Sequence, residues 1–346
     1  VLIGAIGLGA LFGAVQLISI SASLGRKLTT YVFGKRLDPS ATPRLYDFVR
    51  GLAKELGAKP PDHIVLGLDL NFFVTSADVG LVGPNETLNG ETLFVSAPLA
   101  RLLSHEEFTA VLGHELGHFR GGDTEYSLKF APVYAGLSSA VGALASEEGS
   151  GSAGLAKIPA IAILSYMIEV FVINESAIGR EREFVADQAG VEAASREAMA
   201  SALVKVSLYS GLWAQVESSN IERLKKGEFA RNLSSIFQNA AKDDVDHESI
   251  DKIKTEVLKK SIPHPTDTHP PTRDRLEALN LLPSEITKAM LLVPERPAIE
   301  LLENYTAIEE ELTTVWNSFM GALERMEASV EPTDDVAESF SMTAVR

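Results

Sequence analysis

The sequence predicts a mainly α-helical protein with a small β-sheet, an α+β fold, together with transmembrane helices. Three observations support this prediction. Uncharged apolar residues are concentrated in three stretches. Segments with the apolar spacing of amphipathic helices lie between and after these stretches. One short region, from residue 63 to residue 99, instead contains strand-like runs separated by turn residues.

Composition limits the classes of protein and of site. The chain has 346 residues, enough for one large domain or two ordinary ones. Its net charge of −16 argues against a nucleic-acid partner, because nucleic acids bind basic surfaces. It contains no cysteine, so disulfides and cysteine-ligated metals are excluded. Any zinc site must therefore use histidine and carboxylate ligands.

Residues 1–22 are predicted to form a transmembrane helix. The first 20 residues carry no charge, and at 1.5 Å per residue a helix of that length spans a bilayer core of about 30 Å. Six lysines and arginines follow between residues 26 and 50, against two aspartates. This basic flank lies where the positive-inside rule places the cytoplasmic side.

Residues 23–128 are predicted to be the first part of a domain outside the membrane. An amphipathic helix at residues 46–56 precedes strands at 63–70, 71–78 and 91–99, with turns between them. The next helix begins at Ser104, which forms a capping box with Glu107, and ends at Gly121-Gly122. A small sheet therefore leads directly into this helix.

Residues 129–178 are predicted to form a transmembrane hairpin. Two apolar stretches, 130–145 and 158–174, are joined by a short flexible loop. The alternative is a pair of buried helices in a soluble protein. The second stretch runs without a helix breaker into residues 179–281, the predicted second part of the domain, which contains further helices and an extended loop at 263–272. Residues 282–346 are predicted to be a C-terminal extension with a helix at 299–327 and an acidic tail.

The helix that begins at Ser104 contains the motif His114-Glu115-Leu116-Gly117-His118, an H-E-x-x-H. Residues at i and i+4 lie on one helix face, which is where two imidazoles must stand to bind one metal ion. The carboxylate of Glu115 can then reach a water molecule on that metal. The alternative for the motif alone is a buried helix with two hydrogen-bonded histidines.

A catalytic zinc site needs a third protein ligand and an open position for water. Glu183 is the best candidate, because Asp187 lies one helical turn further on and can orient a metal-bound histidine. Glu181 and Glu175 remain alternatives. In such a site Glu115 acts as general base, and a second group stabilises the oxyanion of the tetrahedral intermediate. His269 or Arg275 could be that group, although either residue type is more often structural.

Three segments together resemble the HtpX-like and CAAX-prenyl-protease-like membrane zinc metalloendopeptidases. They are ETLFVSAPLARLLSHEEFTAVLGHELGHFRGGDT, GREREFVAD and THPPTRDRLEAL, in that order along the chain. The resemblance implies a zincin-like metallopeptidase domain of the gluzincin type with one zinc ion per chain. It implies zinc on His114, His118 and Glu183, with Glu115 as the catalytic base and Asp187 supporting the site.

The resemblance also assigns residues around the metal. The family motif H-P-P-x-x-x-R falls on residues 269–275, which implies that His269 faces the substrate or oxyanion and that Arg275 braces the site. The family's Asn-x-Phe strand falls on Asn71 and Phe73, which implies an edge for substrate pairing. The prenyl-protease branch has seven membrane helices and this chain has three candidates, so the bacterial HtpX-like branch is closer.

The resulting hypothesis is an endopeptidase of the bacterial inner membrane whose catalytic domain faces the cytoplasm. Its expected partners are the lipid bilayer and protein or peptide substrates, in particular membrane or misfolded proteins. Two alternatives remain. One is a catalytically silent, zinc-binding membrane scaffold, and the other is a soluble metallopeptidase with buried helices. The sequence predicts no particular oligomeric state.

Overall fold

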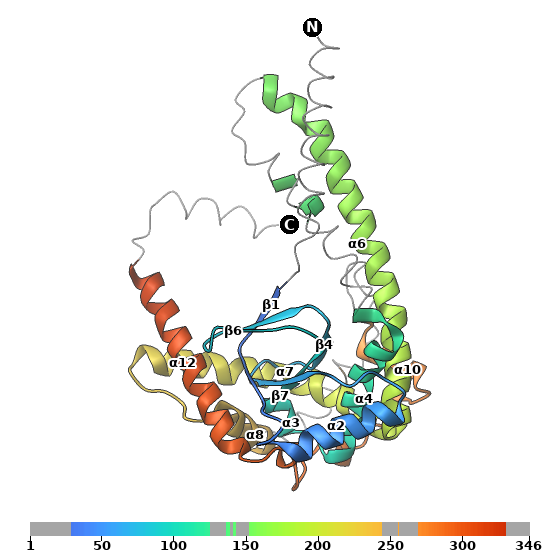
Figure 1. Ribbon diagram of the computed structural model, residues 1–346, viewed down its shortest axis with the longest axis vertical. Coiled ribbons are helices and arrows are strands. Elements are labelled where there is room, and N and C mark those ends of the chain that lie inside the picture. The colour runs from blue at the N-terminus through green and yellow to red at the C-terminus, as the bar shows by residue number, and fades with distance from the viewer. Residues whose placement is uncertain are drawn as a thin grey trace.

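The computed structural model describes residues 29–124, 136–138, 141–142, 152–243, 255 and 269–329. These residues form a mainly helical body with two small sheets, from which one long helix projects (Figure 1). The helix predicted at residues 1–22, nearly all of the first hairpin arm, most of the loop at 263–272 and the acidic tail lie outside the described residues.

A four-stranded sheet forms one side of the body. Its two central strands are parallel and almost completely buried, which explains their continuous apolar sequence. The outer strands pair antiparallel with them, and β4 is an edge strand. In spatial order the sheet contains β2 (Gly34–Arg36), β3 (His63–Gly67), β7 (Thr92–Ser96) and β4 (Phe73–Thr75).

A second sheet of three strands was not predicted. Its strands have three or four residues each, too few to show a periodic pattern. The predicted strand at 71–78 is in fact divided between the two sheets, since it contributes β4 to one and the first residue of β5 to the other. The order is β1 (Thr29–Val32), β5 (Asp78–Leu81) and β6 (Glu86–Leu88).

The helix α4 (His105–Gly121) is central to the body and follows the short helix α3 (Ala97–Ala100). It begins at the predicted capping box and ends at Gly122, whose φ of 71° is the left-handed conformation of a helix C-cap. It contacts α2 (Pro43–Glu55), the edge strand β4 and two later helices. Most of its residues are buried.

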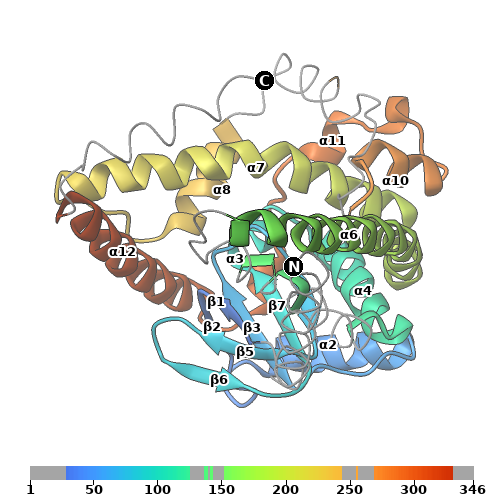
Figure 2. The ribbon, with the colours of Figure 1, turned by 90° about the horizontal axis from the view of Figure 1, so that it is seen from above.

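The helix α6 (Ser152–Ala193) is continuous over 42 residues. Residues 158–174 run into the following segment without a break, as predicted, but the helix already begins inside the predicted loop. Its C-terminal half packs beside α4, and its N-terminal half projects from the body (Figures 1 and 2). Residues Ile161–Ala193 are long and apolar enough to cross a membrane, judged by length and composition. The predicted boundary between hairpin and domain, at 178/179, falls inside this single helix.

Most of the remaining helices pack on α7. α7 (Arg196–Lys225) contacts α4, and α12 (Tyr305–Ser329) packs on α7 and α8. The predicted helix at 299–327 is interrupted before α12, where Asn304 has a φ of 55°. The other helices here are α8 (Leu233–Asp243), α10 (Thr272–Ala278), η1 (Pro283–Glu285), α11 (Lys288–Leu291) and η2 (Ala298–Leu301).

Candidate metal centre

Two imidazoles on α4 converge on one point. The Nε2 atoms of His114 and His118 lie 3.3 Å apart. Each Nδ1 atom points the other way, toward a carboxylate: that of His114 lies 2.9 Å from Asp187, and that of His118 lies 3.0 Å from Asp123. A proton held on Nδ1 by a carboxylate leaves the Nε2 lone pair free, so both histidines present the tautomer that binds a metal.

Glu183 on α6 supplies a carboxylate to the same point. Its Oε1 atom lies 3.5 Å from Nε2 of His118, and its Oε2 atom lies 3.7 Å from Nε2 of His114. His269 Nδ1 lies 3.0 Å from Oε2 without the geometry of a hydrogen bond. This buried oxygen therefore has no hydrogen-bond donor among the described residues.

These distances fit a zinc ion. In a tetrahedral site with Zn–N bonds of about 2.0–2.1 Å, two ligand nitrogens are separated by about 3.3–3.4 Å. The ligand atoms of His114, His118 and Glu183 all lie within 4.8 Å of one another, and among the described residues they form the only such group. A buried carboxylate oxygen without a donor is also what a metal ligand leaves when its ion is removed.

Small residues bring the two helices of the site together. A Cβ atom on Gly113 would lie 2.3 Å from Cβ of Ala193, and one on Gly117 would lie 2.9 Å from Cβ of Ala189. A Cβ atom on Gly190 of α6 would lie 2.7 Å from the carbonyl oxygen of α4 residue 110. This close packing places Glu183 opposite the two histidines, and larger side chains would hold the carboxylate away.

A buried ion pair supports His114. Asp187 accepts from His114 through one oxygen and from Nε of Arg275, at 2.8 Å, through the other. Arg275 belongs to α10, and its Nη1 atom also lies 3.5 Å from Oε2 of Glu183. The side chains of Asp187 and Arg275 are only 1% and 12% exposed. This pair therefore connects α10 to both helices of the site.

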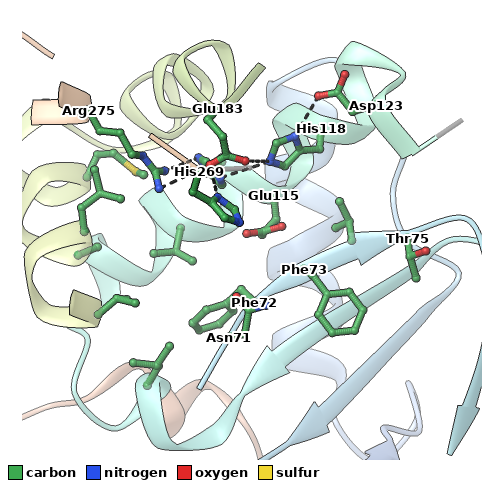
Figure 3. A pocket seen from close by; sticks show the side chains of 18 of the residues that line it. Asn71, Phe72, Phe73, Thr75, Glu115, His118, Asp123, Glu183, His269 and Arg275 are labelled. Atoms are coloured by element: carbon green, nitrogen blue, oxygen red, sulfur yellow. Dashed lines mark hydrogen bonds and ion pairs between the residues drawn. The ribbon is translucent and has the colours of Figure 1, made fainter. Parts of the chain in front are cut away.

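Glu115 and His269 lie on the open side of the centre. Figure 3 shows Glu115 facing the strand that carries Phe73, across the cleft, with His269 beside it. The His269 side chain is 68% exposed. The Glu183 carboxylate raises the pKa of His269 although burial acts in the opposite direction, which favours a protonated imidazole at the edge of the cleft.

The cleft has a volume of about 500 Å³ and two different walls. One wall is the edge strand β4 with Asn71 before it. The other is a face of α7 on which Met199, Leu203 and Val206 recur at helical spacing. The metal-binding group lies between the edge strand β4 and an apolar surface of α7.

The structure brings together every residue that the sequence singled out. Asn71, Phe73, His114, Glu115, His118, Glu183, His269 and Arg275 line the cleft, and Asp187 lies directly behind His114. The alternative ligands do not join the group, and Glu181 is exposed. Sequence reasoning missed Asp123, although an acid five residues after the second histidine was a usable signal. It also missed the apolar face of α7, whose pattern is that of any core helix.

Comparison with known protein families matches residues 39–282 to "Peptidase family M48". The chain belongs to peptidase family M48. A protease HtpX homologue of Archaeoglobus fulgidus is 26% identical over 270 residues, covering 77% of this chain and 75% of the relative. One of Halobacterium salinarum is 29% identical over 279 residues, covering 78% and 88%. Protease HtpX of Xylella fastidiosa is 28% identical over 213 residues, covering 58% and 69%.

No solved structure matches the chain significantly. Family M48 and the HtpX relatives make this chain an HtpX-like metalloprotease, a hydrolase that acts on proteins, as the three motif segments predicted. The mainly helical fold with small mixed sheets is confirmed as well.

Proposed function

We propose that this M48 metalloprotease is a zinc-dependent endopeptidase embedded in a membrane. The observation that supports the proposal best is the convergence of His114, His118 and Glu183 on one point at the floor of a cleft, with Glu115 beside it. Three protein ligands leave a fourth position for water, the arrangement of a catalytic rather than a structural zinc site. Zinc bound there lowers the pKa of its water toward neutrality and polarises the substrate carbonyl.

Glu115 acts as the general base in this proposal. It is buried but lines the cleft, so its carboxylate can take a proton from water and pass it to the leaving amine. His269 is placed to donate a hydrogen bond to the developing oxyanion, because its side chain is 68% exposed and lines the cleft beside Glu115. Arg275 braces the site through Asp187 and Glu183.

The substrate is an extended peptide segment. β4 ends the four-stranded sheet, so its outer edge offers backbone groups to a further strand. Asn71 and Phe73 border that edge on the cleft side (Figure 3). The opposite wall of α7 suits an apolar substrate side chain. Unfolded proteins, including misfolded membrane proteins, expose such extended apolar segments, whereas folded soluble proteins bury them.

Membrane attachment is supported by the surface of α6. Its N-terminal half exposes Ile163, Tyr166 and Met167, with Tyr166 66% exposed. Apolar side chains along a projecting helix are suited to lipid. The basic flank at residues 26–50 supports a catalytic domain on the cytoplasmic side, and the resemblance to bacterial HtpX supports the inner membrane.

The test compares three single substitutions in detergent-purified protein. Glu115→Gln should lower the rate of cleavage of an unfolded, fluorescently labelled protein by about 10²–10⁴-fold while one zinc per chain is retained. Glu183→Gln should lose zinc and activity together. Glu181→Gln, an exposed glutamate two residues away on α6, is the matched control and should leave both unchanged.

Two outcomes would contradict the proposal. Full activity in Glu115→Gln would show that Glu115 is not the general base. Zinc bound by wild type without any chelator-sensitive cleavage of unfolded or membrane protein would favour the catalytically silent scaffold instead.

A further inference from the structure

Each histidine of the metal centre has its own carboxylate and its own arginine. His114 is held by Asp187 and Arg275, as described above. His118 is held in the same way by Asp123, which follows α4, and by Arg182 on α6. Its Nδ1 atom lies 3.0 Å from Oδ2 of Asp123, and the other oxygen of Asp123 lies 3.1 Å from Nε of Arg182. Figure 3 shows Asp123 behind His118, away from the cleft-facing side of the ring.

The end of α4 is built to place Asp123 there. Asp123 lies two residues beyond the last residue of α4. The intervening Gly122 has a φ of 71°, a backbone conformation that residues other than glycine adopt with strain. The left-handed turn directs the chain back along the last helical turn, where His118 lies. The glycine pair 121–122 is therefore more than a helix stop, because it carries the carboxylate to the histidine.

We propose that Asp123 and Arg182 are positioning residues for the metal centre. Asp123 fixes the rotation of the His118 ring and keeps the proton on Nδ1, so that Nε2 presents a lone pair to the metal. Arg182 fixes the orientation of Asp123. The inference rests on the proposed zinc site.

The position of Arg182 gives this pair a second effect. Arg182 directly precedes the ligand Glu183 on α6, whereas Asp123 follows the ligand His118 at the end of α4. The ion pair therefore connects α6 to the end of α4 next to the proposed ligands His118 and Glu183. A shift of α6 along α4 would break the contact and release the His118 ring.

The two carboxylate–arginine pairs differ in exposure, which predicts that they contribute differently to metal affinity. The side chains of Asp187 and Arg275 are 1% and 12% exposed, whereas those of Asp123 and Arg182 are 17% and 28% exposed. Water competes more with the second pair, so its loss should cost less. Carboxylate partners of metal-bound histidines typically contribute about 10–100-fold in metal affinity. Asp123 belongs at the lower end of that range and Asp187 at the upper end.

The experiment measures zinc affinity of detergent-purified variants by competition with a fluorescent chelator. Asp123→Asn should raise the zinc Kd by about 10-fold or more, and Asp187→Asn by more than that. Arg182→Gln should weaken binding by a smaller factor, and Arg182→Lys should restore part of it because the charge returns. The visible spectrum of the cobalt(II)-loaded protein should shift in Asp123→Asn, since a change in ring orientation alters the ligand field.

Glu192→Gln is the matched control. Arg120 and Glu192 also join α4 to α6, with Nη1 of Arg120 2.7 Å from the carboxylate, but neither touches a proposed ligand. An ion pair that only holds the two helices together should have as little effect on zinc binding as the pair of Arg120 and Glu192. The control should therefore leave the zinc Kd within twofold of wild type and the cobalt spectrum unchanged.

The outcomes separate the inference from the function on which it rests. Wild type that binds no zinc would overturn both. Wild type that binds zinc tightly, with Asp123→Asn within twofold of it and an unchanged cobalt spectrum, would overturn the positioning role alone. If Asp123→Asn fails to fold, the two Arg182 variants test the inference instead. Equal zinc affinity in Arg182→Gln and wild type would exclude a positioning role for the pair of Asp123 and Arg182.

Discussion

Arg101 and Glu309 form a buried, two-pronged ion pair between residues 208 positions apart in the chain. Nε of Arg101, just after α3, lies 2.7 Å from Oε1 of Glu309 on α12, and Nη2 lies 2.5 Å from Oε2. The side chains are 9% and 0% exposed. Asn232 adds a further donor to Oε2 at 2.9 Å. The C-terminal helix α12 is thus attached to the segment that leads into α4.

The first prediction follows from this pair. Glu309→Gln should lower the free energy of unfolding by about 3–5 kcal/mol, because a buried guanidinium loses its counter-charge. Chemical unfolding in detergent measures the change. Glu311→Gln is the control on the same helix, since Glu311 is 56% exposed and pairs with Lys35 at the surface. It should change stability by no more than about 1 kcal/mol. Equal effects of the two substitutions would contradict a structural role for the buried pair.

The second prediction concerns the close approach of α4 and α6. Gly113→Ala places a methyl group 2.3 Å from Cβ of Ala193, so the helices must separate. We expect a stability loss of about 1–3 kcal/mol and weaker zinc binding, because Glu183 moves away from the histidines. Calorimetry and zinc titration measure the two effects. The control, Gly51→Ala, fills open space in the middle of α2 and should be neutral or stabilising by up to about 1 kcal/mol. Unchanged zinc affinity in Gly113→Ala would show that the approach of the helices does not set the ligand geometry.

The sequence predicts those parts of the candidate metal-binding group whose relative positions are determined by a single helix. His114, Glu115 and His118 share one helix, whose periodicity determines their relative positions. The pairing of Glu183 with Asp187 was readable for the same reason. Asp123 was not, because it lies beyond the helix, and its position depends on the left-handed turn at Gly122.

The missed parts of the fold have equally local causes. The strands β1, β2, β5 and β6 contain three or four residues, so no alternation could identify them. The attachment of α12 to the body depends on the ion pair between Arg101 and Glu309. No pattern in the sequence around either residue predicts that the two residues pair. The apolar face of α7 resembles a core face, and only the folded chain shows that part of it lines the cleft.

The third prediction is a pH dependence of stability that arises on α7. The pKa of Glu217 is raised to about 7, because burial and charge repulsion from Asp69 together outweigh a hydrogen bond with Trp213. The folded state therefore holds one more proton than the unfolded state between pH 4.5 and 7, so the free energy of unfolding falls as pH rises through this range.

Glu217→Gln should remove this loss of stability. The variant should be more stable than wild type at pH 8 by about 1–2 kcal/mol, reduced from the full value because the side chain is partly exposed, and not at pH 4.5. Asp69→Asn should reproduce part of the gain. Unfolding curves at the two pH values measure it. A constant difference between Glu217→Gln and wild type at both pH values would mean that Glu217 titrates alike in the folded and unfolded chains.

The fourth prediction tests the apolar wall of the cleft. Val206 lies on the face of α7 that lines the cleft, so Val206→Glu places a carboxylate where we propose that an apolar substrate side chain binds. In a series of peptides that differ at the residues flanking the scissile bond, kcat/KM for apolar side chains should fall by about tenfold or more. Values for lysine and arginine at the same position should rise relative to them. Gln215→Glu adds the same charge to an exposed position of α7 and should leave selectivity unchanged. Identical selectivity in Val206→Glu and wild type would place the substrate elsewhere, along β4 alone.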